Sequence, residues 1–135
     1  MAIHRISSGS AYEPKIGYCR AVVVDGWVHV SGTTGTDHKT MTVPDDVVEQ
    51  CRLALEIIER ALSEAGASFD DVVRVHYILP DRKDFEPCWP LLSKAFSSHP
   101  PAATMIEAGL IDPAMKIEIE VTARLPDRVR DMRYP

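Results

Sequence analysis

The run VVRVHYIL at residues 72–79 limits the possible architectures of this chain more than any other segment. It falls in a predicted strand over residues 70–79, and successive side chains of a strand point to opposite faces. One face then carries Val73, Val75, Tyr77 and Leu79, and the other carries Val72 and Ile78. Because apolar side chains occur on both faces, other parts of the protein must cover both sides of this strand.

The rest of the chain alternates between predicted strands and helices. Strands are predicted at residues 18–25 and 27–31, joined by a two-residue hairpin turn at Asp25-Gly26, and at residues 102–108 and 116–123. An amphipathic helix is predicted over residues 44–65, with Gly66 as its left-handed C-terminal residue. A second helix is predicted within residues 84–98. Its regular part should begin near Trp89 or Pro90, because proline is tolerated only in the first turn.

These elements follow one another in the order β-β-α-β-α-β-β, which is typical of a mixed α+β fold in one domain of 135 residues. Two helices can cover one face of one sheet, and no further segment is left to cover the second face. An exposed apolar sheet surface usually marks an interface. The pattern therefore predicts a homo-oligomer.

Charge and composition argue against several classes of function. Twenty acidic and fifteen basic side chains give a net charge of −5, and no basic run offers a surface for phosphate groups, so nucleic acid is not an expected partner. No stretch has the roughly 20 apolar residues of a membrane helix, so a membrane partner is not expected either. Residues 1–10 contain no apolar signal core, which makes the cytoplasm the expected compartment. The three cysteines and five histidines show no metal-ligand spacing, and no metal site is predicted.

Two pairs of polar side chains are candidates for chemistry. Glu118 and Glu120 share one face of the last predicted strand, where two carboxylates can act as general acid and base or can form a solvent-facing stripe. Tyr18 and Arg20 share one face of the first predicted strand, where they can bind a carboxylate or form a surface pair. Trp89, at the irregular helix start, can form a pocket wall or pack in the core. The residue pattern leaves these alternatives open.

Five motifs resemble those of the RidA (YjgF-like) family of enamine and imine deaminases. They are IGYCRAV at residues 16–22, VHVSG at 28–32, EAGASFDDVV at 64–73, HPPA at 99–102 and KIEIE at 116–120. The matches span about residues 16–124, which is nearly all of the predicted single domain of residues 1–135. The resemblance implies a chorismate-mutase-like fold and a homotrimer with small-molecule pockets at the subunit interfaces. It implies no metal or organic cofactor.

The resemblance also implies roles for individual residues. Tyr18 matches a first-strand tyrosine of the active site, Gly32 a glycine that contributes a backbone contact, and Glu118 a glutamate that positions the hydrolytic water. Ala103 stands where the family's Pro-Ala-Arg motif places the arginine that binds the substrate carboxylate. Met105 replaces a cysteine two residues later, and Trp89 lies near the position of an asparagine. The chain therefore resembles a divergent branch that lacks the substrate-binding arginine.

These matches predict a cofactor-free hydrolase of the enamine or imine deaminase type, acting on a small reactive metabolite. Either Arg20 or another basic residue replaces the missing arginine, or the substrate has no carboxylate there; Trp89 and Met105 would make the pocket more apolar. The alternative is a trimeric binding module that retains the pocket and has lost the chemistry. A less favoured alternative is the endoribonuclease or translation-inhibitor function attached to the family, which the acidic net charge disfavours.

Overall fold

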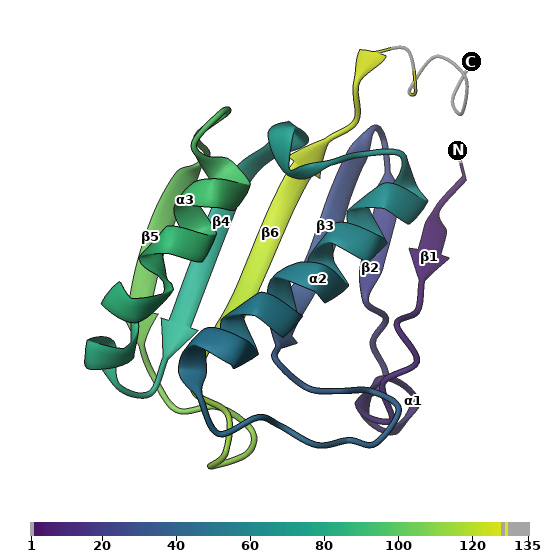
Figure 1. The fold of residues 1–135 in the computed structure, drawn as a ribbon. Coiled ribbons are helices and arrows are strands. Elements are labelled where there is room, and N and C mark those ends of the chain that lie inside the picture. The colour runs from purple at the N-terminus through teal and green to yellow at the C-terminus, as the bar shows by residue number, and fades with distance from the viewer. Residues whose placement is uncertain (1, 128, 130–135) are drawn as a thin grey trace.

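The computed structural model describes residues 2–127 and residue 129, which form a six-stranded sheet with the helices α2 and α3 on one face (Figure 1). The strand order is β1-β2-β3-β6-β4-β5. The strands are β1 (His4–Ile6), β2 (Ala21–Val24), β3 (Trp27–Thr34), β4 (Val72–Leu79), β5 (Ala102–Glu107) and β6 (Glu118–Arg124). The helices are α1 (Tyr12–Ile16), α2 (Val47–Ala65) and α3 (Trp89–Phe96), with short 3-10 turns η1 (Phe69–Asp71), η2 (Arg82–Asp84) and η3 (Glu86–Cys88). The predicted α+β fold is confirmed.

Pairing within the sheet is antiparallel except between β4 and β5, which run parallel. A parallel pair needs a crossover connection, and α3 supplies it on the helical face (Figure 1). The β2–β3 hairpin turns at Asp25 and Gly26, whose φ angles of 54° and 79° fit the predicted tight turn.

Helix α2 packs over the centre of the sheet because its apolar residues recur on one side. Cys51, Ala54, Ile58 and Leu62 are fully or almost fully buried. The helix begins three residues later than predicted, because the Asp46 side chain caps it by accepting a hydrogen bond from the Glu49 backbone N–H at 3.3 Å. Its C-terminal end at Gly66 (φ 93°) is as predicted.

The predicted facing of β4 is wrong at its start. Val72 lies opposite Ala123 and Arg74 opposite Thr122, so β4 carries one residue more than β6 between these pairs, which is a β-bulge. The bulge turns Val72 into the core, where it is 3% exposed, and leaves Val73 45% exposed. Both residues therefore have the opposite facing from the one that strict alternation predicts.

The sheet face away from the helices has no covering element in the described part of the chain (Figure 1), as the element order predicts. This face is more polar than predicted. Its side chains include the ion pair of His76 with Glu120 at 3.1 Å and the hydrogen bond that Arg74 donates to Thr104 at 2.5 Å. The homo-oligomer therefore remains a proposal, since this face is not a continuous apolar surface.

The N-terminal elements β1 and α1 were not predicted. β1 is only three residues long, too short for a periodic pattern, and pairs with β2. The first strand of the hairpin begins at Ala21 rather than at residue 18, because Gly17 adopts a φ of 93° and Tyr18 still belongs to the turn after α1. This turn brings residues 8–20 to the end of β3. None of the helices within residues 2–127 is long and apolar enough to cross a bilayer.

Candidate active site

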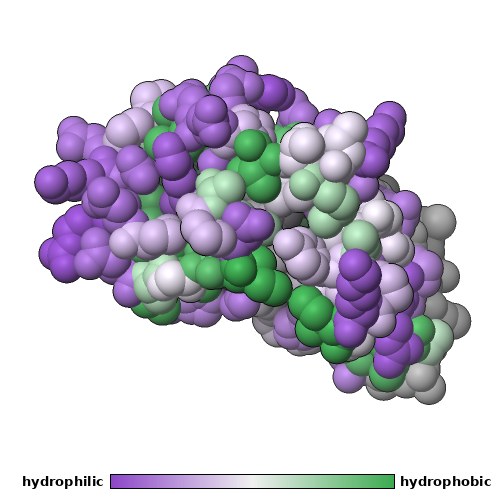
Figure 2. Space-filling view, turned by 90° about the horizontal axis from the view of Figure 1, so that it is seen from below, coloured by the Kyte–Doolittle hydropathy of each residue, from purple (hydrophilic) through white to green (hydrophobic). Residues whose placement is uncertain are grey.

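A pocket of about 380 Å³ opens at the end of the sheet where β3 and β6 meet the N-terminal segment. Four of the residues expected in the site line it together: Tyr18, Arg20, Gly32 and Glu118. Figure 2 looks onto this end of the molecule from below, where hydrophobic residues form a band across the middle and hydrophilic residues lie beside it. A hollow of similar volume between α2 and α3 contains none of the predicted site residues.

Glu118 reaches this pocket because of a second irregularity in the sheet. The three-residue step from Val30 to Thr33 on β3 faces the two-residue step from Val121 to Ile119 on β6, so β3 bulges around Gly32. A Cβ atom added to Gly32 would lie 2.8 Å from both Cδ and Oε2 of Glu118. Only glycine therefore lets the Glu118 carboxyl group lie directly against the β3 backbone.

The environment of Glu118 favours its protonated form. Burial raises the pKa of its carboxyl group first, and the nearby charge of Glu120 raises it further, while Arg20 acts in the opposite direction; the net pKa is raised. Glu118 and Glu120 share a face of β6, as predicted, but Glu120 is exposed and pairs with His76. The two carboxylates therefore have different environments, and Glu118, the half-buried one with the raised pKa, is the better candidate for proton transfer.

Arg20 and Tyr18 are in direct contact. Nη2 of Arg20 donates to the Tyr18 hydroxyl oxygen at 3.3 Å, and the guanidinium carbon lies 5.4 Å from the centre of the Tyr18 ring. Arg20 is 3% exposed and also donates from Nη1 to the Gly32 carbonyl oxygen at 2.9 Å. The pair predicted to share a strand face thus lies just before β2, with Tyr18 half-buried at the pocket wall.

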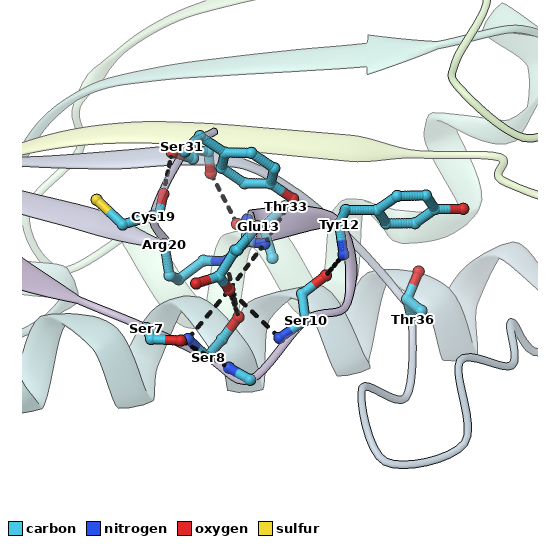
Figure 3. A network of polar contacts seen from close by, with 12 residues as sticks. Ser7, Ser8, Ser10, Tyr12, Glu13, Cys19, Arg20, Ser31, Thr33 and Thr36 are labelled. Atoms are coloured by element: carbon cyan, nitrogen blue, oxygen red, sulfur yellow. Dashed lines mark hydrogen bonds and ion pairs between the residues drawn. The ribbon is translucent and has the colours of Figure 1, made fainter. Parts of the chain in front are cut away.

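Glu13 of α1 is the acidic partner of Arg20 (Figure 3). Its Oε2 lies 3.8 Å from Nη2 of Arg20 and accepts hydrogen bonds from the Ser8 hydroxyl at 2.6 Å and the Ser8 N–H at 3.1 Å. Burial acts to raise the pKa of Glu13, but the hydrogen bonds from Ser8 and Ser7 and the charge of Arg20 outweigh it, and the pKa is lowered. Glu13 therefore stays ionised, which a buried arginine requires.

The other three predicted site residues lie elsewhere. Trp89 and Ala103 line a separate apolar hollow of about 290 Å³ beside the edge strand β5, together with Tyr77 and Phe85. Trp89 is 51% exposed and contacts Phe85 edge-on, with ring centres 6.1 Å apart. Met105 is partly buried and packs against the core. Within one chain, six of the seven predicted site residues are thus divided between two hollows, and Met105 lies in neither.

Sequence reasoning did not single out His38, which lines the Glu118 pocket. Burial, followed by the charge of Arg20, lowers the pKa of His38, so its imidazole is neutral at physiological pH. No local signal marks this residue, because it lies in the irregular loop that follows β3. Among residues 2–127 and 129, no three histidine, cysteine, aspartate or glutamate side chains are grouped so that they could hold a metal ion.

The fold defines a class that is well represented among solved structures. A Mycobacterium tuberculosis member of the YjgF/YER057c/UK114 family has a TM-score of 0.83 and 37% sequence identity over 92% of this chain and 100% of its own. A putative endoribonuclease L-PSP from Entamoeba histolytica has a TM-score of 0.82 and 30% identity over 92% of this chain and 100% of its own.

Sequence relatives lead to the same class. A RutC family protein of Pyrococcus abyssi is 33% identical over 91% of this chain and 98% of its own. The 2-iminobutanoate/2-iminopropanoate deaminase of Capra hircus is 32% identical over 90% of each chain. The family model described as Endoribonuclease L-PSP matches residues 8–125. The chain belongs to this family, the RidA (YjgF-like) proteins, as the sequence motifs indicate.

Proposed function

We propose that this protein is a cofactor-free hydrolase that releases ammonia from a small imine or enamine in the pocket of Glu118. The observation that carries the proposal is the half-buried Glu118 carboxyl group, which lies against Gly32 and has a raised pKa. Support also comes from relatives described as 2-iminobutanoate/2-iminopropanoate deaminases, at 32% and 31% identity over 90% of this chain. We expect the activity in the cytoplasm, where the free cysteines would stay reduced.

The proposed chemistry needs one group that moves protons. Ionised Glu118 accepts a proton from a water molecule whose oxygen forms a bond to the imine carbon, and the proton passes to the imine nitrogen. The resulting amino alcohol then loses ammonia: its hydroxyl proton moves to nitrogen through Glu118, the C–N bond breaks and a C=O bond forms. The Tyr18 hydroxyl and the Gly32 backbone, which lie at the same pocket, hold the substrate during both steps.

The proposal includes the homotrimer implied by the sequence motifs. The apolar hollow of Trp89 and Ala103 and the pocket of Glu118 are separate in one chain. In the proposed trimer, the hollow of one subunit joins the Glu118 pocket of the next. Ala103 offers no charge to a substrate carboxylate, and the hollow around it is aromatic. The preferred substrate therefore carries an apolar group, rather than a carboxylate, at the part that lies in the hollow of Ala103.

Ala103 also favours a second candidate function, the trimeric binding module without catalysis. An unpaired carboxylate in a desolvated site loses about 2–5 kcal/mol of binding free energy, which would remove simple 2-imino acids as substrates. Retention of Glu118 with a raised pKa favours the hydrolase. For the endoribonuclease alternative, the net charge of −5 offers no support.

The test is ammonia release from freshly generated imines, with and without a carboxylate. Wild type should accelerate the release, and Glu118→Gln should lose at least 100-fold in rate while the oligomer mass stays the same. Glu59→Gln, which removes an exposed carboxylate of α2, is the matched control and should keep the full rate. Equal rates for Glu118→Gln and wild type would refute the hydrolase. Absence of acceleration with every imine, combined with metabolite-induced increases in melting temperature, would support the binding module instead.

A further inference from the structure

We propose that Arg20 is a positioning residue that fixes the Tyr18 hydroxyl and the Gly32 backbone, and that residues 8–13 of the N-terminal segment hold Arg20 in place. The inference rests on the proposed function, because it gives a role to residues around the same pocket. It differs from the sequence-based expectation that Arg20 binds the substrate carboxylate.

Four of the five N–H groups of the Arg20 guanidinium donate hydrogen bonds to other groups of the chain. Nε donates to the Ser8 hydroxyl at 3.1 Å, and Nη1 donates to the Gly32 carbonyl oxygen at 2.9 Å and to the Thr33 hydroxyl at 3.1 Å. Nη2 donates to the Tyr18 hydroxyl at 3.3 Å and lies 3.8 Å from the Glu13 carboxylate. Because Arg20 is 3% exposed and four of its N–H groups are already used, a substrate carboxylate could form two hydrogen bonds with it only by displacing one of these partners.

The direction of the Tyr18 hydrogen bond has a chemical consequence. A guanidinium group can only donate, so the Tyr18 oxygen must accept, and its own proton is free to point elsewhere. Tyr18 lines the pocket of Glu118, which makes that proton a hydrogen-bond donor for a ligand. The Gly32 carbonyl is held in the same way, and it lies in the bulge that lets Glu118 approach. Arg20 thus fixes both sides of the pocket without touching the substrate.

Arg20 is itself held by the segment that runs into α1 (Figure 3). The Ser8 hydroxyl accepts from Nε of Arg20 and donates to Glu13, so one side chain joins both ions. The Glu13 carboxylate also accepts from the Ser10 backbone N–H at 3.4 Å. Glu13 is 5% exposed, and ions this well buried are costly unless every partner is in place. Disturbing Ser8 should therefore disturb Tyr18 through Arg20.

A double-mutant cycle on the hydrolysis of imines with and without a carboxylate tests the inference. If Arg20 acts through Tyr18, Arg20→Gln and Tyr18→Phe should each lower kcat about tenfold with KM changed less than threefold, and the double variant should lose little more than either single variant. If Arg20 binds the carboxylate, Arg20→Gln should raise KM at least tenfold for carboxylate imines only, and the two losses should multiply. That result would overturn the inference. Arg52→Gln, an exposed arginine paired with Glu49 on α2, is the control.

A second readout does not depend on activity. With 3-fluorotyrosine incorporated, the Tyr18 fluorine resonance, assigned from Tyr18→Phe, should shift in Arg20→Gln and also in the milder Ser8→Ala variant. An unchanged Tyr18 resonance in folded Ser8→Ala and Arg20→Gln would overturn the inference. If the Tyr18 resonance shifts in both variants while wild type hydrolyses no imine, the positioning role is supported and the hydrolase is refuted.

Discussion

Gly32 and Glu118 form the central contact of the site, because only a glycine leaves room for the carboxyl group. Gly32→Ala places a Cβ atom 2.8 Å from that group, so the flexible end of Glu118 must move away; this should change the stability by less than about 1 kcal/mol and lower any Glu118-dependent rate at least tenfold. Urea unfolding and ammonia release measure the two effects. Gly109→Ala is the matched control, since a Cβ atom at Gly109 meets nothing within 4 Å. Equal effects of the two substitutions would show that the close approach has no importance.

The raised pKa of Glu118 predicts a pH dependence of both activity and stability. Since the ionised form is the base, the rate should fall with decreasing pH at values above the ordinary glutamate pKa of about 4.3. A raised pKa means that the folded state binds the proton more tightly, so stability is lost as pH rises through that pKa. Glu118→Gln should therefore melt about 1–3 °C higher than wild type at pH 7, with the difference vanishing in acid. A lower melting temperature at pH 7 would mean that ionised Glu118 stabilises the fold.

The pKa of Glu13 is shifted in the opposite direction from that of Glu118, so its effect on stability has the opposite pH dependence. Its lowered pKa means that the folded state binds the proton less tightly, so its contribution to stability is present above about pH 4.3 and is lost as pH falls through its folded-state pKa. Glu13→Gln leaves Arg20 without its counter-ion and should cost about 3 kcal/mol at pH 7. It should also flatten the loss of stability between pH 5 and pH 3. Urea unfolding across this pH range would detect an unchanged slope, which would contradict the assignment.

Individual site residues differ in how far the sequence reveals them. The shared face of Glu118 and Glu120 follows from the period of a strand, and family motifs lead to Tyr18 and Gly32. The burial of Arg20 could not be predicted, because its partners Ser8 and Thr33 lie 12 and 13 residues away along the chain, and no periodic pattern records such contacts.

At the scale of elements, the sequence predicts the helices and strands that are long enough to show a repeating pattern of apolar residues. The amphipathic pattern of α2, the β2–β3 hairpin and the start of α3 at Trp89 are confirmed. β1 is missed because three residues carry no period. The bulges in β3 and β4 are missed because an extra residue in one strand is defined only by its pairing with β6. The bulge in β3 shapes the site, because it brings Gly32 next to Glu118.

The bulge in β4 gives a direct comparison of two neighbouring valines. Val72→Ala removes a side chain that is 3% exposed and should cost about 2 kcal/mol, whereas Val73→Ala, at a residue 45% exposed, should cost less than about 0.5 kcal/mol. Urea unfolding of the two variants measures the difference. Strict alternation along β4 predicts the reverse order, and observing that order would show that the bulge is absent.

At the scale of the whole molecule, the two separate hollows lead to the proposed assembly. Ala103→Arg restores a guanidinium beside β5, in the hollow that contains Trp89. If that hollow joins the Glu118 pocket of a neighbouring subunit, the variant should increase kcat/KM for 2-iminobutanoate at least tenfold, about 1.4 kcal/mol. Its effect on imines without a carboxylate should be neutral or negative. An equal change for both substrate types would show that Ala103 does not lie beside the substrate carboxylate.

The rate of ammonia release from an imine without a carboxylate, compared between wild type and Glu118→Gln at equal protein concentration, is the most direct test. The account predicts acceleration by wild type and a loss of at least 100-fold in the variant, with both proteins folded and of the same oligomer mass. Release that is accelerated equally by both proteins would contradict the assignment of Glu118 as the base.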